Sequence, residues 1–423
     1  MRYTKRDRNT ELILPVLCAV LTVPAAHVVF MLFSGKHLFA SNPYNSYILQ
    51  AKAWCDGSLW LPENYPWLEL AVYKGHYFVS FPPFPSYLLL PFTAVFGENT
   101  PDSVIAFCVM LIGVVYAVRA AYHCGMRGET SACMAVFLYC ANNVWMVTVD
   151  AWVWFLAQNL ALTLTLMAFD YGLMGKFGRS LFFLAAAVGC RPFQIVYLPV
   201  ILYWLMQKEL MSRQSFVRVF LRRICRFVPA LLLGASYMVL NVLRFDDPFE
   251  FGHNFLPEFL RHEEGQFSSE YLLHNFPRLF ELPTLDPESR KLIFQGFDGT
   301  NIFIVFPIFA LLLFAVIAEA YRRIRSRSAG DKQAYISVVM LFCLSAAHIL
   351  LLCAHRTMGG AHFGNRYLID TLPALYLALC KLTEPDEAQN MPILQKIGGM
   401  LFMICGVSGL LINFVGVLQF YAQ

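Results

Sequence analysis

Apolar residues occur in long blocks along this 423-residue chain, with short polar stretches between them. A helix needs about 20 such residues to cross a hydrocarbon core that is about 30 Å thick. The pattern predicts spans at 12–33, 103–122, 131–149, 152–169, 181–205, 227–243, 301–321, 334–354, 367–383 and 397–420. We therefore expect an all-α membrane protein, a polytopic transmembrane helical bundle of about 10–11 spans that forms a single domain over residues 1–423.

The segment 83–96 is apolar but short and rich in proline, and it leaves two topologies open. If it crosses the membrane, the mildly basic loops at 123–127 and 176–179 lie outside. If it is re-entrant and the block 181–205 is broken at Arg191-Pro192, those loops lie inside. Both alternatives give an even number of crossings between the first two basic segments, and we favour the first.

Basic residues in short loops predict the orientation, since cytoplasmic loops carry an excess of Lys and Arg. Such residues gather in the N-terminal segment 1–10, in 207–226 and in 322–332. These segments are expected in the cytoplasm, so the loops 34–81 and 245–300 lie outside. The run 12–33 exceeds the 7–15 apolar residues of a signal peptide, so we expect a retained first span in the cell membrane.

Composition agrees with a membrane class, because 58% of the residues are hydrophobic and 14% are charged. Soluble domains are typically about 45–50% apolar and about 25% charged. The net charge of +4 is small and dispersed, which gives no support for a nucleic-acid partner. Most of the twelve cysteines lie inside apolar blocks, where they are expected to be packing residues, and no CxxC spacing occurs.

The first outer loop contains charged residues of both signs, as any solvated loop does. Asp56 and Glu69 are carboxylates, and Lys74 and His76 are nearby basic groups. Transfer from a lipid phosphate requires a cation on the phosphate and a carboxylate that deprotonates the acceptor hydroxyl. The many aromatic residues of this loop fit a sugar-binding surface, and they fit equally a belt at headgroup level.

Charged residues also occur at the edges of apolar blocks. Arg366 and Asp370, separated by four positions, would share one face of a helix at the outer end of a span. The glycine-rich segment 359–364 before them would let a headgroup approach the backbone, and Tyr367 lies beside them. Together these residues indicate either a phosphate site or an ion pair between two spans. Arg191, before Pro192, either snorkels to one interface or reaches a polar cavity that holds an anion.

Several motifs occur in a characteristic order along the chain. They are Ala51, Ala53 and Gly57, the turn Lys74-Gly75-His76-Tyr77, Pro82-Pro83, Phe96-Gly97, Cys190-Arg191-Pro192 and Phe363-Gly364-Asn365-Arg366-Tyr367. This order resembles the C-type membrane glycosyltransferases, in the branch of protein mannosyltransferases and lipid A aminoarabinose transferases.

The resemblance implies a polyprenyl-phosphate-linked sugar as donor, taken up at the outer face of the membrane among membrane lipids. The acceptor would be a glycan, a lipid or a protein. A divalent metal is one alternative, and no other cofactor is expected. Lys74 matches a position at which the branch places a phosphate-contacting cation.

The chain departs from the branch after the first span. Where the branch usually carries an acidic residue, this sequence has Asn45, which cannot act as a base. The catalytic role would then fall to Glu69 or Asp56. Two other interpretations stay open, a transporter or flippase of lipid-linked sugars and a membrane assembly subunit without catalysis, although the sequence has no internal symmetry typical of transporters.

Overall fold

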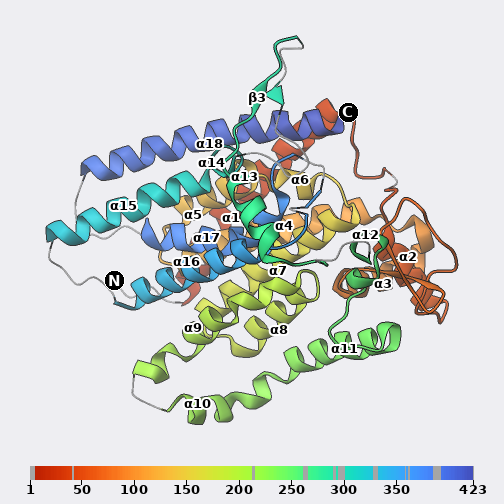
Figure 1. The fold of residues 1–423 in the computed structure, drawn as a ribbon. Coiled ribbons are helices and arrows are strands. Elements are labelled where there is room, and N and C mark those ends of the chain that lie inside the picture. The colour runs from red at the N-terminus through yellow and green to blue at the C-terminus, as the bar shows by residue number, and fades with distance from the viewer. Residues whose placement is uncertain are drawn as a thin grey trace.

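Helices that run roughly along one common axis make up most of the molecule (Figure 1). The computed structural model describes residues 5–40, 42–211, 215–260, 265–288, 292–293, 301–326, 332–357, 359–360, 363–383 and 392–422. The long helices are α1 (Lys5–Ser34), α4 (Asp102–His123), α7 (Val153–Leu173), α11 (Val228–Phe245), α15 (Ile308–Ser326), α16 (Lys332–Cys353) and α18 (Pro392–Tyr421). Within the described ranges, six helices (all of these except α15) are long and apolar enough to cross a membrane. The predicted polytopic helical bundle is confirmed.

Several predicted spans are broken into shorter elements. The block 131–149 divides into α5 (Gly128–Cys140) and α6 (Trp145–Thr148), and the block 181–205 divides into α8 (Phe177–Val188), η2 (Pro192–Tyr197) and α9 (Leu198–Met211). Arg191 has an extended backbone (φ −140°, ψ 102°) because Pro192 disfavours the helical conformation of the preceding residue. The break therefore places a charged side chain between two helical segments.

Two contacts determine where the short loops lie. Tyr122, near the end of α4, donates a hydrogen bond of 2.9 Å to Glu11 in the first part of α1. A Cβ atom on Gly178, in α8, would lie 3.4 Å from the carbonyl oxygen of Arg226. The loops 123–127 and 174–176 thus lie at the end of the bundle that holds the start of α1 and the arginines of 218–226. We call this the basic end, and the opposite end the loop end.

Our preferred topology, with 83–96 as a span, is therefore wrong. Helix α3 (Phe84–Phe96) has 13 residues, which extend about 20 Å. It packs on α2 (Ser46–Cys55) at the loop end, at the right of Figure 1. The alternative topology, with a re-entrant 83–96 and a break at Arg191, agrees with the structure.

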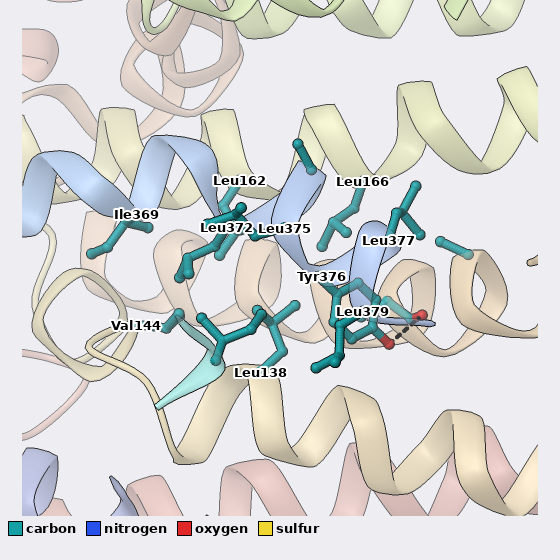
Figure 2. Packing of buried hydrophobic residues seen from close by; sticks show 14 of the residues in the cluster. Leu138, Val144, Leu162, Leu166, Ile369, Leu372, Leu375, Tyr376, Leu377 and Leu379 are labelled. Atoms are coloured by element: carbon teal, nitrogen blue, oxygen red, sulfur yellow. Dashed lines mark hydrogen bonds between the residues drawn. The ribbon is translucent and has the colours of Figure 1, made fainter. Parts of the chain in front are cut away.

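Helix α17 (Leu372–Leu382) occupies the centre of the bundle (Figure 2). Its buried side chains, among them Leu372 and Leu375, pack against Leu138 and Leu162 of α5 and α7. The hydroxyl of Tyr376 donates a 3.0 Å hydrogen bond to the carbonyl oxygen of Ala117 in α4. Residues 372–380 and 382 are all buried, so other helices surround α17 on every side. This packing fixes η5 (Arg366–Thr371), which leads directly into α17.

Short elements occur in the loops 34–81 and 245–300, which we call the first and second outer loops after their predicted position, and in the remaining connections. They are η1 (Gly97–Asn99), α10 (Phe216–Arg223), η3 (Ile224–Arg226), η4 (His253–Phe255), α12 (Pro257–Leu260), α13 (Ser269–Arg278), α14 (Ile302–Val305) and two hairpins, β1 (Leu70–Tyr73) with β2 (His76–Val79) and β3 (Thr284–Leu285) with β4 (Leu292–Ile293). In the first hairpin the antiparallel register pairs Leu70 with Val79 and Tyr73 with His76. This hairpin brings the end of the first outer loop back towards α3.

Candidate active site

A cavity of about 350 Å³ lies at the loop end, where the outer loops meet α7, η2 and η5. Four of the charged residues singled out in the sequence line it, namely Glu69, Arg191, Arg366 and Asp370. They come from three segments that are far apart along the chain, since Arg366 and Asp370 both belong to η5 (Arg366–Thr371). The bundle therefore brings together two guanidinium groups and two carboxyl groups around one space.

Arg366 begins η5 and is 4% exposed. Its Nε donates a 3.0 Å hydrogen bond to the carbonyl oxygen of Gly359, and its Nη1 donates one of 3.0 Å to Oε1 of Gln158. Gln158 is fully buried in α7, and its Nε2 donates to the carbonyl oxygen of Arg366 at 3.0 Å. Donors at both ends of the guanidinium are thus held by fixed oxygens, so the group has a defined orientation at the cavity wall.

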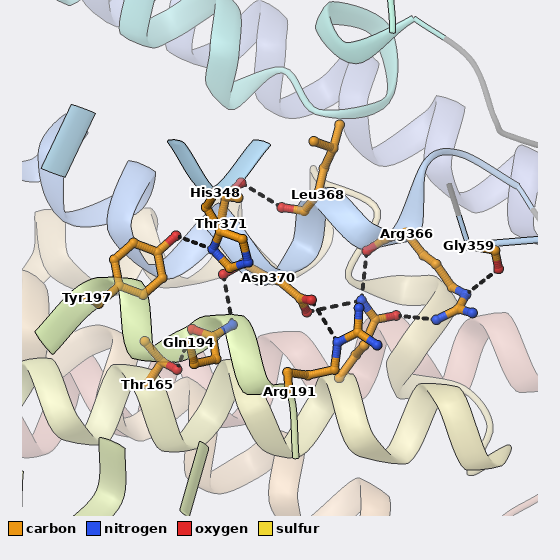
Figure 3. Close-up of polar contacts among 11 residues, drawn as sticks. Thr165, Arg191, Gln194, Tyr197, His348, Gly359, Arg366, Leu368, Asp370 and Thr371 are labelled. Atoms are coloured by element: carbon orange, nitrogen blue, oxygen red, sulfur yellow. Dashed lines mark hydrogen bonds and ion pairs between the residues drawn. The ribbon is translucent and has the colours of Figure 1, made fainter. Parts of the chain in front are cut away.

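Asp370 pairs with Arg191, whose Nε donates to Oδ2 of Asp370 at 2.7 Å (Figure 3). The other carboxyl oxygen, Oδ1, accepts a 3.1 Å hydrogen bond from Nε2 of Gln158. Residues 366–371 form a 3-10 helix, so the predicted arrangement, in which Asp370 lies on a helix face with Arg366 and orients it, does not occur. Gln158 instead joins the two by contacting both side chains.

Tyr367 contacts both guanidinium groups. Its ring centre is 4.7 Å from Cζ of Arg191 and 4.9 Å from Cζ of Arg366, distances typical of cation–π contacts. The electron-rich ring thus stabilises both cations at the cavity. Together the three residues form a cationic wall with an aromatic centre.

Glu69, just before β1, provides the opposite charge on another side of the cavity. Its Oε2 accepts a 3.1 Å hydrogen bond from Nε1 of Trp154, and Ser80 Oγ donates to its carbonyl oxygen at 3.0 Å. Removal of the carboxyl from water raises the pKa of Glu69, while the Trp154 bond partly opposes this shift. A carboxylate with a raised pKa accepts a proton more readily near neutral pH.

The second outer loop forms a further wall, none of whose residues was predicted from the sequence as a site residue. Glu250, His253 and Glu258 from this loop line the cavity, and His355, just after α16, lies beside them. Desolvation lowers the pKa of His253 to about 3 and that of His355 to about 4, so both imidazoles are neutral at pH 7. Two features of the sequence could have indicated this wall, namely the many acidic residues of the loop and the position of His355 at the end of an apolar block.

The other candidate residues of the first outer loop do not line the cavity. Asp56 follows the end of α2, where it pairs with Lys52. His76 is exposed and stacks on Trp60 with ring centres 4.2 Å apart. Asn45 precedes the first residue of α2, and its carbonyl oxygen accepts from Ile48 N at 2.9 Å.

Lys74, expected at the donor phosphate, forms an ion pair with Asp246 at the start of the second outer loop. It too is absent from the cavity lining. Of the predicted glycine-rich segment, Ala361 and His362 lie outside the described residues, whereas Gly359 and Gly360 line the cavity.

Metal binding has no ready site in the part of the chain that the structure describes. No group of three His, Cys, Asp or Glu side chains there is arranged to hold a metal ion. The involvement of a divalent metal stays a prediction.

The sequence matches no protein-family model, and no curated protein sequence matches it either. Solved structures, however, share its fold. ArnT from Cupriavidus metallidurans bound to undecaprenyl phosphate superimposes with a TM-score of 0.53 at 13% identity, covering 95% of this chain and 77% of that chain. The same protein in the apo state gives a TM-score of 0.50 at 14% identity, covering 95% of this chain and 76% of that chain.

This likeness defines the class to which the fold belongs. The chain has the polytopic fold of the C-type membrane glycosyltransferases, of which ArnT, an aminoarabinose transferase, is a solved example. At such low identity the comparison establishes the fold alone. The resemblance deduced from the motifs is confirmed at this level.

Proposed function

We propose that this protein is a membrane glycosyltransferase that takes a sugar from a polyprenyl-phosphate donor in the cavity at the loop end. The observation that carries the proposal is the grouping of Arg191, Arg366 and Glu69 around one cavity in this fold. Undecaprenyl phosphate is bound by the structurally similar ArnT, which supports the same class of donor here.

The cationic wall is the proposed binding site of the donor phosphate. A guanidinium group offers several parallel N–H donors, which match phosphate oxygens better than an ammonium group does. Arg366 is the proposed principal contact, because its orientation is fixed by Gly359 and Gln158. Arg191 contributes a second positive charge, part of which its partner Asp370 neutralises.

Glu69 is the proposed general base. In an inverting transfer, the acceptor oxygen forms a bond to the anomeric carbon while the bond from that carbon to the phosphate oxygen breaks. The electron pair of the broken bond stays on the polyprenyl phosphate, where the arginines stabilise its charge. The acceptor proton passes to the Glu69 carboxylate, whose raised pKa suits this role.

The test replaces each of two carboxylates in the same loop. Loss of a general base commonly lowers the rate about 10²–10⁴-fold. In purified full-length protein supplied with synthetic polyprenyl-phosphate sugars and membrane extract as acceptor, Glu69→Gln should reduce the release of polyprenyl phosphate at least about a hundredfold. Asp56→Asn, remote from the cavity, should leave it unchanged.

Equal, modest losses in the two variants would contradict the assignment of Glu69. A parental protein that moves the lipid-linked sugar across vesicle membranes without cleaving it would favour the transporter instead. The donor type, the acceptor class and the base are thus tested in one assay.

We also propose that the loop end faces the outside of the cell membrane and that the N-terminus is cytoplasmic. The arginines at 218, 222, 223 and 226 at the basic end support this orientation. A reporter fused after Asp247 should then be active outside, and one fused after Ser326 should be active inside. Activity of both reporters on the same side would contradict the topology.

A further inference from the structure

Two strained residues face each other across the outer loops. Among the described residues, Lys74 (φ +48°) and Asp246 (φ +60°) are the non-glycine residues with positive φ. Their side chains form an ion pair. Left-handed backbone at residues other than glycine costs free energy and persists where surrounding contacts enforce it.

Each conformation has a local cause. Lys74 and Gly75 both have positive φ and form the two-residue turn of the β1–β2 hairpin, a type I′ geometry that usually selects Asn or Gly. Asp246 ends α11 in a left-handed cap, with its N–H donating to the carbonyl oxygen of Val242 at 2.9 Å. Glycine is the usual residue at such a cap, so both positions carry a charged side chain where a smaller residue would fit the backbone better.

Further contacts join the same two segments. Tyr73 Oη donates to Oδ2 of Asp246 at 2.7 Å, and Arg244 Nη1 donates to the carbonyl oxygen of Val79 at 3.2 Å. The contacts from Lys74 and then Tyr73 lower the pKa of Asp246, so this carboxyl is ionised at neutral pH. Beneath the pair, Phe245 packs in a small apolar cluster that also contains Ala71 and Phe78.

The residues that follow Asp246 form the loop wall of the cavity. Phe249, Glu250, His253 and Phe259 line it from this segment. Gly252, in the middle, has φ +104° and approaches Ser80 so closely that a Cβ atom would lie 3.1 Å from its Cα. The position of this wall therefore depends on how the start of the second outer loop is held against the β1–β2 hairpin.

We propose that Lys74 and Asp246 are positioning residues that clasp the two outer loops together and hold residues 247–259 as a wall of the cavity. This inference rests on the proposed function only where its test measures the binding of undecaprenyl phosphate. It assigns to Lys74 an ion pair with the second loop in place of contact with the donor phosphate.

The clasp predicts a specific pattern of amide hydrogen exchange in the full chain in nanodiscs. Both partners are largely exposed, with side-chain exposures of 66% and 60%, and exposed ion pairs contribute modestly. Lys74→Ala and Asp246→Ala should each speed exchange across 247–259 about twofold to fivefold. The swap Lys74→Asp with Asp246→Lys should restore slow exchange, since both residue types already adopt positive φ at these positions.

A matched control is Lys52→Ala, which removes an exposed ion pair within α2 of the same outer loop. It should leave exchange in 247–259 unchanged. In each clasp variant, the affinity for undecaprenyl phosphate should stay within about twofold of the parental value, because Lys74 lies outside the cavity.

Unchanged exchange in both alanine variants would overturn the clasp. Loss of undecaprenyl phosphate binding in Lys74→Ala that the swap fails to restore would also overturn it and would make Lys74 a phosphate ligand. Exchange needs no catalysis, so a failure of the proposed function, seen as full turnover by Glu69→Gln, would leave the result on the clasp intact.

Discussion

The cavity has two walls of different construction. The bundle wall is formed by Arg191, Arg366 and Asp370, with the buried Gln158 behind them. Arg366 and Asp370 are buried and Arg191 is partly exposed, and hydrogen bonds of 2.7 to 3.1 Å join these side chains. The loop wall, residues 247–259, is held at its start by an exposed ion pair. The first is fixed by the core around α17, and the second by contacts that water screens.

The two walls would have different tasks in the proposed reaction. The bundle wall would bind the donor phosphate, and the loop wall would admit the donor and the acceptor. A phosphate site gains from donors whose orientation is fixed before the ligand arrives. A wall that must admit a donor and an acceptor gains from a lower local stability, because such segments open at a small free-energy cost. Substitutions in the bundle wall should therefore have large effects, and substitutions at the base of the loop wall should have small ones.

The largest effect is expected at Arg366. Arg366→Ala removes charge-assisted hydrogen bonds that are worth about 1.5–3 kcal/mol each, so affinity for undecaprenyl phosphate should fall about a hundredfold or more. Arg366→Lys should recover little, because an ammonium group cannot reproduce the paired donors. Scintillation proximity or calorimetry with undecaprenyl phosphate measures this, and parental affinity in the alanine variant would remove Arg366 from the site.

The next largest effect is expected when the ion pair between Arg191 and Asp370 is broken, and it concerns the stability of the folded protein. Asp370 is 1% exposed, and Asp370→Ala would leave Arg191 without its partner. Breaking a buried ion pair by removing one member typically costs about 3–5 kcal/mol. Thermal unfolding of the detergent-solubilised protein should shift clearly downward, whereas Asp56→Ala, which breaks an exposed pair, should not shift it. A stable Asp370→Ala variant would mean that the pair lies in water.

Gln158 should have an intermediate effect as a positioning residue. Gln158→Leu removes the acceptor that orients Arg366 and the donor to Asp370. Unpaired buried polar groups cost about 1–3 kcal/mol, so the Kd for undecaprenyl phosphate should rise about tenfold. Asn159→Leu is the control, since this buried neighbour contacts Ala106 instead and should lower stability without changing that Kd. Equal Kd changes in both would indicate general unfolding.

The smallest expected effect is the pH dependence of turnover in the parental protein, which reports the ionisation of Glu69. Burial raises its pKa, so turnover should fall with decreasing pH at a value above the usual carboxyl range near 4.3. The folded state binds this proton more tightly than the unfolded state, so Glu69 opposes folding as pH rises through and beyond its unfolded pKa. Glu69→Gln should therefore lose turnover at pH 7 without losing thermal stability. A destabilised variant would indicate a structural role.

The bundle wall was largely predictable from the sequence. Arg191, Arg366 and Asp370 are charged residues in or beside apolar blocks, a pattern that indicates function in membrane proteins. Their pairing was not predictable, since Arg191 and Asp370 are 179 positions apart. Gln158 was missed because one amide in an apolar helix resembles a packing residue until its partners are known.

The residues of the loop wall could largely not be predicted from the sequence. Its residues acquire a shared surface only through the fold of two long loops, which no periodicity describes. The partner of Lys74 was not predictable from the sequence either. Its motif suggested a contact with the donor phosphate, whereas in the folded chain Lys74 lies in a left-handed turn and forms an ion pair with Asp246. The short α3 was also misjudged, since apolar composition does not reveal whether a helix crosses or returns.

The most direct test is a structure of the protein with undecaprenyl phosphate, determined by cryo-electron microscopy in nanodiscs. We expect the phosphate within hydrogen-bonding distance of the Arg366 guanidinium, near Arg191, with the Glu69 carboxyl facing the space left for the sugar. Phosphate density at Lys74, or an empty cavity at saturating lipid, would contradict the account.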